Sequence, residues 1–301
     1  MDAKQRLKLV ERYRVEDGKA FRLKRFATDD KAGLNNSKQE IADLLREGVE
    51  RLSEIQDKLY AQDRWAVLCI FQAMDAAGKD GAIKHVMSGV DPKGCQVFSF
   101  KRPSDEELDH DFLWRCVTRL PERGRIGIFN RSYYEDVLVV RVRPALLDTS
   151  RIPRRLITPR IWRERYEDIN ALERYLSRNG YAIRKFFLHV SPDEQLNRFE
   201  ERLDEPAKNW KFALGDLHEH LRWSDYMRAY REAIRHTASP HAPWVLVPAD
   251  NKWYARLVIA GAIVDALEGL GLEFPALNAA KRRELKQGRR LLAAARRQLG
   301  H

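Results

Sequence analysis

The sequence is poor in cysteine and has no long uninterrupted apolar run. Cys69, Cys95 and Cys116 cannot all pair, and none of them forms a C-x-x-C motif, so a disulfide framework is not expected. Each lies in or beside an apolar segment, which predicts buried free thiols in a reducing compartment. The longest apolar run, 257–267, contains Asp265 and is too short to span a bilayer. The chain also starts without an apolar leader stretch, so we expect a cytoplasmic protein with no membrane contact.

Several functional signatures are missing as well. The chain contains no G-x-S-x-G, no G-x-G-x-x-G and no cysteine–histidine spacing typical of zinc, which removes the usual hydrolase, dinucleotide and zinc-finger patterns. Most of the chain also lacks net charge. The total is +11, but residues 1–26 carry +5 and residues 276–301 carry +7, which leaves −1 for residues 27–275. A basic protein is expected to meet a polyanion, and an anion site in this neutral body must be a local cluster of cations.

What is present is an alternation of short apolar runs with longer stretches of helical periodicity. Such alternation is typical of a parallel sheet covered by helices. The predicted strands are 65–71, 95–100, 126–129, 183–190 and 244–247. Capping-box sequences at 104–107 and 191–194 predict two helix starts. We therefore expect an α/β fold with one doubly wound, five-stranded parallel sheet. Its domain would span 38–275, between a basic N-terminal arm, 1–37, and a basic helical tail, 276–301.

The loop after the first predicted strand has the placement of a phosphate-binding loop. Residues 72–81 follow a strand and precede a helix, so backbone N–H groups and Lys79 can meet an anion. The match to G-x-x-x-x-G-K-[ST] is imperfect, because Ala73 replaces the first glycine and Asp80 replaces the hydroxyl residue that holds magnesium. Asp75 is then the obvious oxygen ligand for a metal. An ordinary strand–turn–helix junction remains the alternative. The other predicted phosphate-binding residues of this loop are Ala76, Ala77, Gly78, Asp80 and Gly81.

Two further segments carry charge where the same fold would need it. The loop after the predicted strand 126–129 holds Arg131, placed to neutralise a transferred phosphoryl group, and carboxylates suited to metal and base roles. A polar loop with internally paired charges is equally compatible. Residues 198–214 contain cations one helical turn apart and a Pro-broken segment, which suits a lid that closes on phosphates. A solvated helix with Arg–Glu pairs is the alternative. The remaining candidate residues are Asn130, Glu135, Asp136, Arg198, Arg202, Lys208, Lys211, Lys101 and Arg102.

Three of these segments together resemble the polyphosphate kinase 2 family. They are the phosphate-binding loop 71–81, the loop 129–136 and the lid sequence 208–212, and the similarity extends from about residue 13 to about residue 275. The resemblance implies a thymidylate-kinase-like P-loop fold and magnesium-dependent phosphoryl exchange between inorganic polyphosphate and nucleotides, with manganese as a possible substitute. A homo-oligomer, dimer or tetramer, is expected.

The resemblance also implies roles for individual residues. Asp75 and Asp136 would hold the metal, Lys79 would bind the transferred phosphates, and Arg131 would complete the centre. The combination of Asn130 with Glu135 and Asp136 resembles the subgroup that accepts nucleoside monophosphates as well as diphosphates, so AMP and ADP, and GMP or GDP, are the expected acceptors.

Two rival functions stay open from the sequence. One is an ATP-dependent nucleoside-monophosphate kinase on the same fold. The other is a nucleic-acid-binding protein that acts through its basic ends, although these ends have no interleaved aromatic residues.

Overall fold

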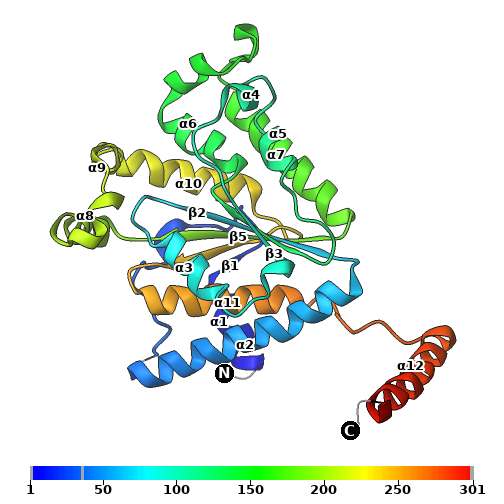
Figure 1. Cartoon of the computed structure of the whole chain (residues 1–301). Helices are drawn as coiled ribbons and strands as arrows, with labels where there is room; N and C mark the ends of the chain where they lie inside the picture. Colours follow the sequence, from blue (N-terminus) through cyan, green and yellow to red (C-terminus); the bar gives the residue numbers. More distant parts are fainter. Residues whose placement is uncertain (1–2, 35–36, 299–301) are drawn as a thin grey trace.

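The computed structural model describes residues 3–34 and 37–298 and shows a central sheet between two layers of helices (Figure 1). The strands are β1 (Arg14–Val15), β2 (Ala66–Ala73), β3 (Cys95–Ser99), β4 (Ile126–Asn130), β5 (Tyr181–His189) and β6 (Trp244–Pro248). Their order across the sheet is β1-β6-β5-β2-β4-β3, and all neighbours are parallel except β1 and β6. The five predicted strands are confirmed. The sheet has a sixth, antiparallel edge strand that the sequence analysis did not predict.

The sixth strand comes from the basic N-terminal segment. Arg14 pairs with Val245 and Val15 with Trp244, so only two residues enter the sheet. A strand this short leaves no readable alternation in the sequence. The helix before it, α1 (Ala3–Tyr13), buries Val10 and Tyr13 against the body, and the Tyr13 hydroxyl lies 2.8 Å from the hydroxyl of Tyr254. The first part of the chain is therefore packed into the domain.

The helices divide between the two faces of the sheet. The remaining long helices are α2 (Lys38–Gln62), α3 (Lys79–Val86), α7 (Ile161–Arg178), α8 (Pro192–Asp204), α10 (Trp223–Thr237), α11 (Lys252–Glu268) and α12 (Ala279–Gln298). The shorter ones are α4 (Asp105–Leu108), α5 (Trp114–Val117), α6 (Val139–Val142) and α9 (Leu214–His220). α1, α2, α3 and α11 cover one face, and α6, α7 and α10 lie on the other (Figure 1). Among the described helices, none has the length and apolar content needed to cross a bilayer.

The strand order positions the site. β2 is buried almost throughout and lies between β4 and β5, so the chain leaves β2 for one side of the sheet and returns for the other. In such sheets the carboxyl ends of the strands on either side of this reversal enclose a crevice where ligands bind. The loops after β2 and β4 both open into that crevice.

One predicted helix cap differs from the expectation. The box at Ser104 and Glu107 is complete, with both side chains bonded to backbone N–H groups. At the start of α8 the Ser191 hydroxyl accepts from the Glu194 N–H, but the Glu194 carboxylate accepts from Arg198 at 2.7 Å instead of turning back. The Ser191 N–H donates to Asp250. A charge-assisted bond to a guanidinium has displaced the weaker cap contact.

Candidate functional site

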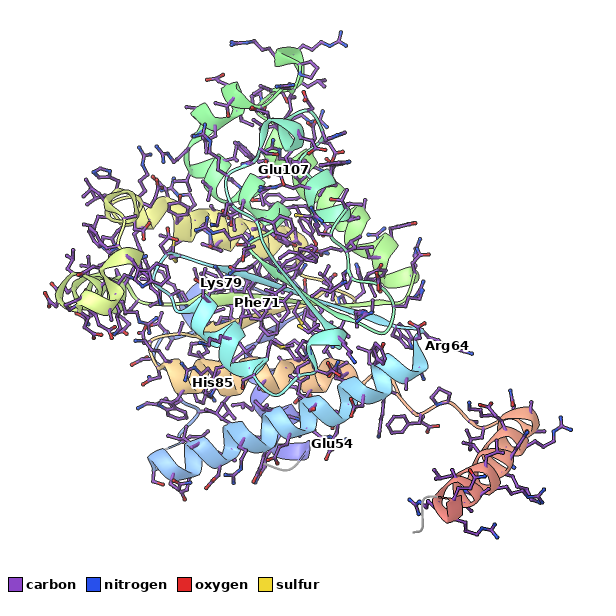
Figure 2. All side chains as sticks on the ribbon, in the orientation of Figure 1. Glu54, Arg64, Phe71, Lys79, His85 and Glu107 are labelled. Carbon is purple, nitrogen blue, oxygen red and sulfur yellow. The ribbon has the colours of Figure 1, made fainter. Side chains whose placement is uncertain are left out.

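The loop between β2 and α3 has the backbone of a phosphate-binding turn. Gly78 has φ +92° and caps α3, and Ala76 has φ +59°, a left-handed conformation that is unfavourable for a residue with a Cβ. Lys79 is the first residue of α3, directly after the turn that follows β2, and Figure 2 labels it. The turn therefore puts the lysine and the helix N-terminus at the same point of the crevice.

Lys79 is tied to the loop after β4. Its Nζ donates to Oδ1 of Asn130, and Nδ2 of Asn130 donates to Oδ1 of Asp80 at 2.6 Å. Burial lowers the pKa of Lys79, while the carboxylates of Asp80, Glu135 and Asp75 favour its charged form. The hydrogen bond of the ammonium thus goes to a neutral amide, and the carboxylate of Asp80 lies 3.8 Å away.

Arg131 joins the same two loops from the other side. Its Nη2 lies 3.0 Å from Oδ1 of Asp75, and its backbone N–H donates to the carbonyl of Phe71. Arg131 has φ +65°, so a non-glycine residue again occupies the left-handed region. Burial opposes the charge of its guanidinium, but Glu135 and Asp75 outweigh this and raise its pKa. The two loops are therefore crosslinked by charge at the point where they meet.

Glu135 and Asp136 face different surroundings. Burial is the main cause of the raised pKa of Glu135, whose charge also senses Arg131, Lys79 and Asp75. Burial raises the pKa of Asp136 too, but its neighbours are Arg165, at 3.5 Å, and Arg115. Asp136, expected with Asp75 as a metal ligand, thus lies against Arg165, whereas Glu135 has Arg131, Lys79 and Asp75 as its charged neighbours. Adjacent residues in a 3₁₀ turn, η3 (Tyr133–Val137), point in different directions, which sequence order does not reveal.

A buried ion pair supports the η3 turn from behind. Glu173 and Lys185 are fully buried and 2.6 Å apart. Glu173 accepts hydrogen bonds from the hydroxyls of Tyr133 and Tyr134, and Lys185 also donates to Tyr134 and to the carbonyl of Thr237. Burial lowers the pKa of Lys185 against the opposing effect of Glu173. The turn that presents Glu135 and Asp136 is therefore anchored in the core.

Two cavities lie on either side of Lys79 and Arg131. The first, of about 270 Å³, adjoins the phosphate-binding loop and the lid. Ten predicted residues line it: Ala76, Ala77, Gly78, Lys79, Asp80, Gly81, Arg198, Arg202, Lys208 and Lys211. Lys252 and Arg256 of α11 complete its cationic wall, and the sequence analysis missed both. They lie on a helix far along the chain, and only the fold brings that helix beside the loop.

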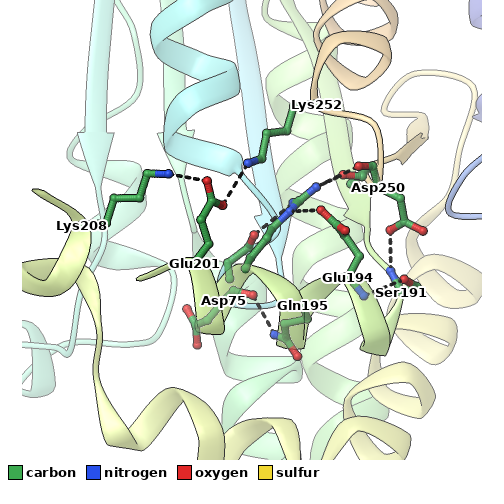
Figure 3. Close-up of polar contacts among 11 residues, drawn as sticks. Asp75, Ser191, Glu194, Gln195, Glu201, Lys208, Asp250 and Lys252 are labelled. Atoms are coloured by element: carbon green, nitrogen blue, oxygen red, sulfur yellow. Dashed lines mark hydrogen bonds and ion pairs between the residues drawn. The ribbon is translucent and has the colours of Figure 1, made fainter. Parts of the chain in front are cut away.

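Several cations of the lid side are already paired. Lys208 contacts Glu205 and Glu201, and Lys252 lies 3.4 Å from Glu201. Figure 3 shows the two lysines on either side of Glu201. Arg202 lies 3.2 Å from Asp216. Ion pairs of this kind were the alternative to a phosphate-binding lid for residues 198–214. The segments involved are α8, η6 (Pro206–Lys211), α9 and α11.

Arg198 has a different role from the other lid cations. Its side chain is 5% exposed, and it donates to the carbonyls of Ala76, Ala249 and Asp250 besides its bond to Glu194. Gln195 adds a bond from the same helix to the carbonyl of Asp75 at 2.7 Å (Figure 3). Most of the donors of Arg198 are thus used by protein oxygens, and α8 is bonded to the phosphate-binding loop.

The second cavity, of about 500 Å³, lies beyond β3 and β4. The predicted residues Lys101, Arg102, Arg131, Glu135 and Asp136 line it. Arg115, Arg143 and Arg165 also line it and were not predicted. Asp75 and Asn130 line neither cavity but make the contacts that join them. All the predicted site residues therefore lie around one centre, between two spaces rich in cations.

The chain is similar to known proteins over nearly all of its length. Residues 35–274 match the family described as Polyphosphate kinase 2. The chain is 51% identical over 284 residues to the ADP-polyphosphate phosphotransferase of Rhodopseudomonas palustris, covering 94% of this chain and 98% of that protein. It is 43% identical over 266 residues to the AMP/ADP-polyphosphate phosphotransferase of Meiothermus ruber, covering 88% and 96%.

A solved structure agrees with these sequence relationships. The crystal structure of Polyphosphate Kinase 2 from Arthrobacter aurescens TC1 superposes with a TM-score of 0.84 at 40% identity, over 93% of this chain and 96% of that one. The resemblance seen in the sequence is thereby confirmed, together with the P-loop kinase fold. The chain belongs to the polyphosphate kinase 2 family.

Proposed function

We propose that this protein transfers a phosphoryl group from inorganic polyphosphate to AMP or ADP, and reversibly. The observation that carries the proposal is the position of Lys79 and Arg131 between two cation-lined cavities at the carboxyl ends of the central strands. A phosphoryl transfer needs alignment and charge neutralisation more than covalent help from the protein. The names of the relatives support the same donor and acceptors.

The two cavities suit different substrates. The first is lined by the phosphate-binding loop and by cations of α8, η6 and α11, which fits a phosphate chain. The second has cations near Arg131 and apolar walls from Val139, Leu146 and Leu147, which fits a nucleotide with its base and sugar. Polyphosphate would therefore enter on the α3 side and the nucleotide on the β3 side.

In this arrangement each side chain has a task. Lys79 neutralises charge on the donor end, and Arg131 does so on the group in transfer. Glu135 lies where it can accept a hydrogen bond from the nucleotide or orient it. Arg198 holds the phosphate-binding loop in its conformation through the carbonyl of Ala76. The lid cations Arg202 and Lys208 would exchange their present carboxylate partners for phosphate oxygens. Lys211, whose ammonium lies over the ring of Trp210, would bind phosphate oxygens as well.

The oxygen donors around the centre fit Mg²⁺. This ion is commonly bound by one or two carboxylates together with substrate phosphates. Asp75 would supply one carboxylate, and the surroundings of Glu135 favour it over Asp136 as the second. Bound magnesium would screen the repulsion between donor and acceptor phosphates. No set of three or more acidic, histidine or cysteine side chains in the described residues is arranged to hold a metal alone.

A product assay tests the proposal. AMP, ADP, GMP and GDP are each incubated with polyphosphate and magnesium, and the nucleotides are separated and quantified. We expect formation of ADP from AMP and of ATP from ADP. Rapid phosphorylation of AMP by ATP, with no product from polyphosphate, would instead assign the protein as an ATP-dependent nucleoside-monophosphate kinase. The same purified protein, analysed by light scattering, tests the expected homo-oligomer.

A further inference from the structure

The last helix, α12, is separate from the kinase body. It begins ten residues after α11 ends, and every described side chain of it is exposed (Figure 1). Figure 2 shows its side chains projecting into solvent on all sides. The family match ends at residue 274, before α12 begins. The helix is thus an addition to the catalytic fold and contributes nothing to the sheet or to either cavity.

The charges of α12 are concentrated on one face. At 3.6 residues per turn, seven of its eight cations fall within an arc of roughly 140°. These seven are Arg282, Arg283, Lys286, Arg289, Arg290, Arg296 and Arg297. The eighth, Lys281, lies outside the arc and pairs at 2.8 Å with Glu284, the one acidic residue of the helix. Within the described part of the chain, no carboxylate pairs with any of the seven.

This arrangement forms a row of cations without counter-charges. A helix of 20 residues is about 30 Å long, so the row extends over several phosphate units of a linear polyanion. Leu272 is buried against the core, so at most the six residues 273–278 link α12 to the body. As a flexible segment they would span roughly 13 Å. Lys252, at the start of α11, lines the first cavity, whereas α12 follows the other end of this 17-residue helix. A chain of a few phosphates held in that cavity cannot contact α12, and only a long polymer can extend to it.

We propose that the basic face of α12 is a second binding site for polyphosphate, which holds the part of a long chain that extends beyond the active site. This inference rests on the proposed function, since it takes polyphosphate as the donor. Two linked contacts with one polymer raise its apparent affinity by making the second contact intramolecular. The effect should appear as a preference for long chains.

Polyphosphate fits this face better than a nucleic acid does. The tail 276–301 contains no aromatic residue, so it offers no surface on which bases can stack. Its recognition is limited to charge, which a polyphosphate chain supplies on every unit. The apolar face, with Leu285, Leu291 and Leu292, also lacks the Trp and Phe side chains that are common in membrane-surface helices.

A triple substitution in the full chain tests the inference. Arg283→Gln, Lys286→Gln and Arg290→Gln together remove three of the seven charges of the face. We expect the KM for long-chain polyphosphate to rise about tenfold, which corresponds to about 1.4 kcal/mol. The KM for tripolyphosphate and the kcat with either donor should stay unchanged. The matched control is Arg163→Gln, Arg174→Gln and Arg178→Gln, three exposed residues of α7 with the same change in charge.

The outcomes separate this inference from the proposed function. Equal KM values for wild type and the α12 variant would overturn it, and so would an equal rise in the α7 control, which would indicate a general charge effect. If the wild type uses no polyphosphate at all, the proposed function fails. Equilibrium binding of long-chain polyphosphate to the wild type and to the α12 variant then shows whether α12 binds the polymer. Loss of RNA binding in the α12 variant, with polyphosphate binding unchanged, would assign the face to nucleic acid instead.

Discussion

The buried pair of Glu173 and Lys185 offers a sharp test of what holds the catalytic turn. Glu173→Gln keeps a carbonyl oxygen that can accept from Tyr133 and Tyr134. It removes the only charge that compensates Lys185 among its described contacts, at a site with 0% exposure. The substitution therefore separates the loss of the ion pair from the loss of the hydrogen bonds.

The expected cost is large. Removing one partner of a buried ion pair leaves an uncompensated charge and destabilises proteins by about 3–5 kcal/mol. For a domain of this size, about 2 °C of Tm is lost per kcal/mol, so Tm should fall by roughly 6–10 °C. Adding Lys185→Met removes the uncompensated charge, and the double variant should recover half or more of the loss.

The assay is chemical denaturation followed by tryptophan fluorescence, repeated at several pH values. Burial already lowers the pKa of Lys185 in the folded state, and the loss of Glu173 lowers it further. The unfolded state then binds more protons than the folded state, so the stability of the single variant should rise with pH toward the unfolded pKa of about 10.4. A loss below about 1 kcal/mol, or a double variant no more stable than the single one, would refute this reasoning.

Four further outcomes follow from the site. Lys79→Ala and Asp75→Asn should each lower kcat/KM by about a hundredfold or more, because each removes a charge next to the transferred phosphoryl group. An unchanged rate in either variant would exclude that residue from the reaction. Arg202→Ala should raise the KM for polyphosphate. The rise should be smaller at high salt, because salt already screens the contact in the wild type. Thermal melting should give the same Tm for both proteins. Arg198→Ala should lower Tm as well as activity, since it leaves three backbone carbonyls without their donor; an unchanged Tm would contradict its bracing role. Burial raises the pKa of Glu135 in the folded state, so folding takes up a proton. The stability of the protein should therefore fall as pH rises above about 4.3, the pKa of glutamate in the unfolded chain. Glu135→Gln should make this pH dependence shallower in a denaturation series, and an identical slope would show that another group titrates.

The sequence was sufficient for the parallel sheet and for the phosphate-binding turn. Each of the five parallel strands is a run of apolar residues long enough to be read locally, and β2 is buried on both faces as its lack of alternation predicts. The turn before α3 is likewise a local pattern, because Gly78 and Lys79 act through neighbouring backbone. Features that depend on one short segment follow directly from the residues of that segment.

The partners of the charged residues could not be predicted in this way. Arg198 lines the first cavity, but its bonds to the carbonyls of Ala249 and Asp250, which follow β6, form only in the folded chain. Asp136 was expected to hold a metal together with Asp75, and its contact with Arg165 of α7 is formed only in the folded chain. Long-range pairing decides both cases, and no spacing in the sequence encodes it. The same reason hides Lys252 and Arg256 from sequence analysis.

The separation of the two cavities has a kinetic consequence. In the described part of the chain they have no lining residue in common, so occupation of one leaves the other accessible. We therefore expect both reactants to be bound at once, in either order, and the phosphoryl group to pass directly from donor oxygen to acceptor oxygen with inversion at phosphorus. Double-reciprocal plots for such a sequential mechanism intersect, whereas the parallel lines of a ping-pong mechanism would indicate that a phosphorylated side chain intervenes.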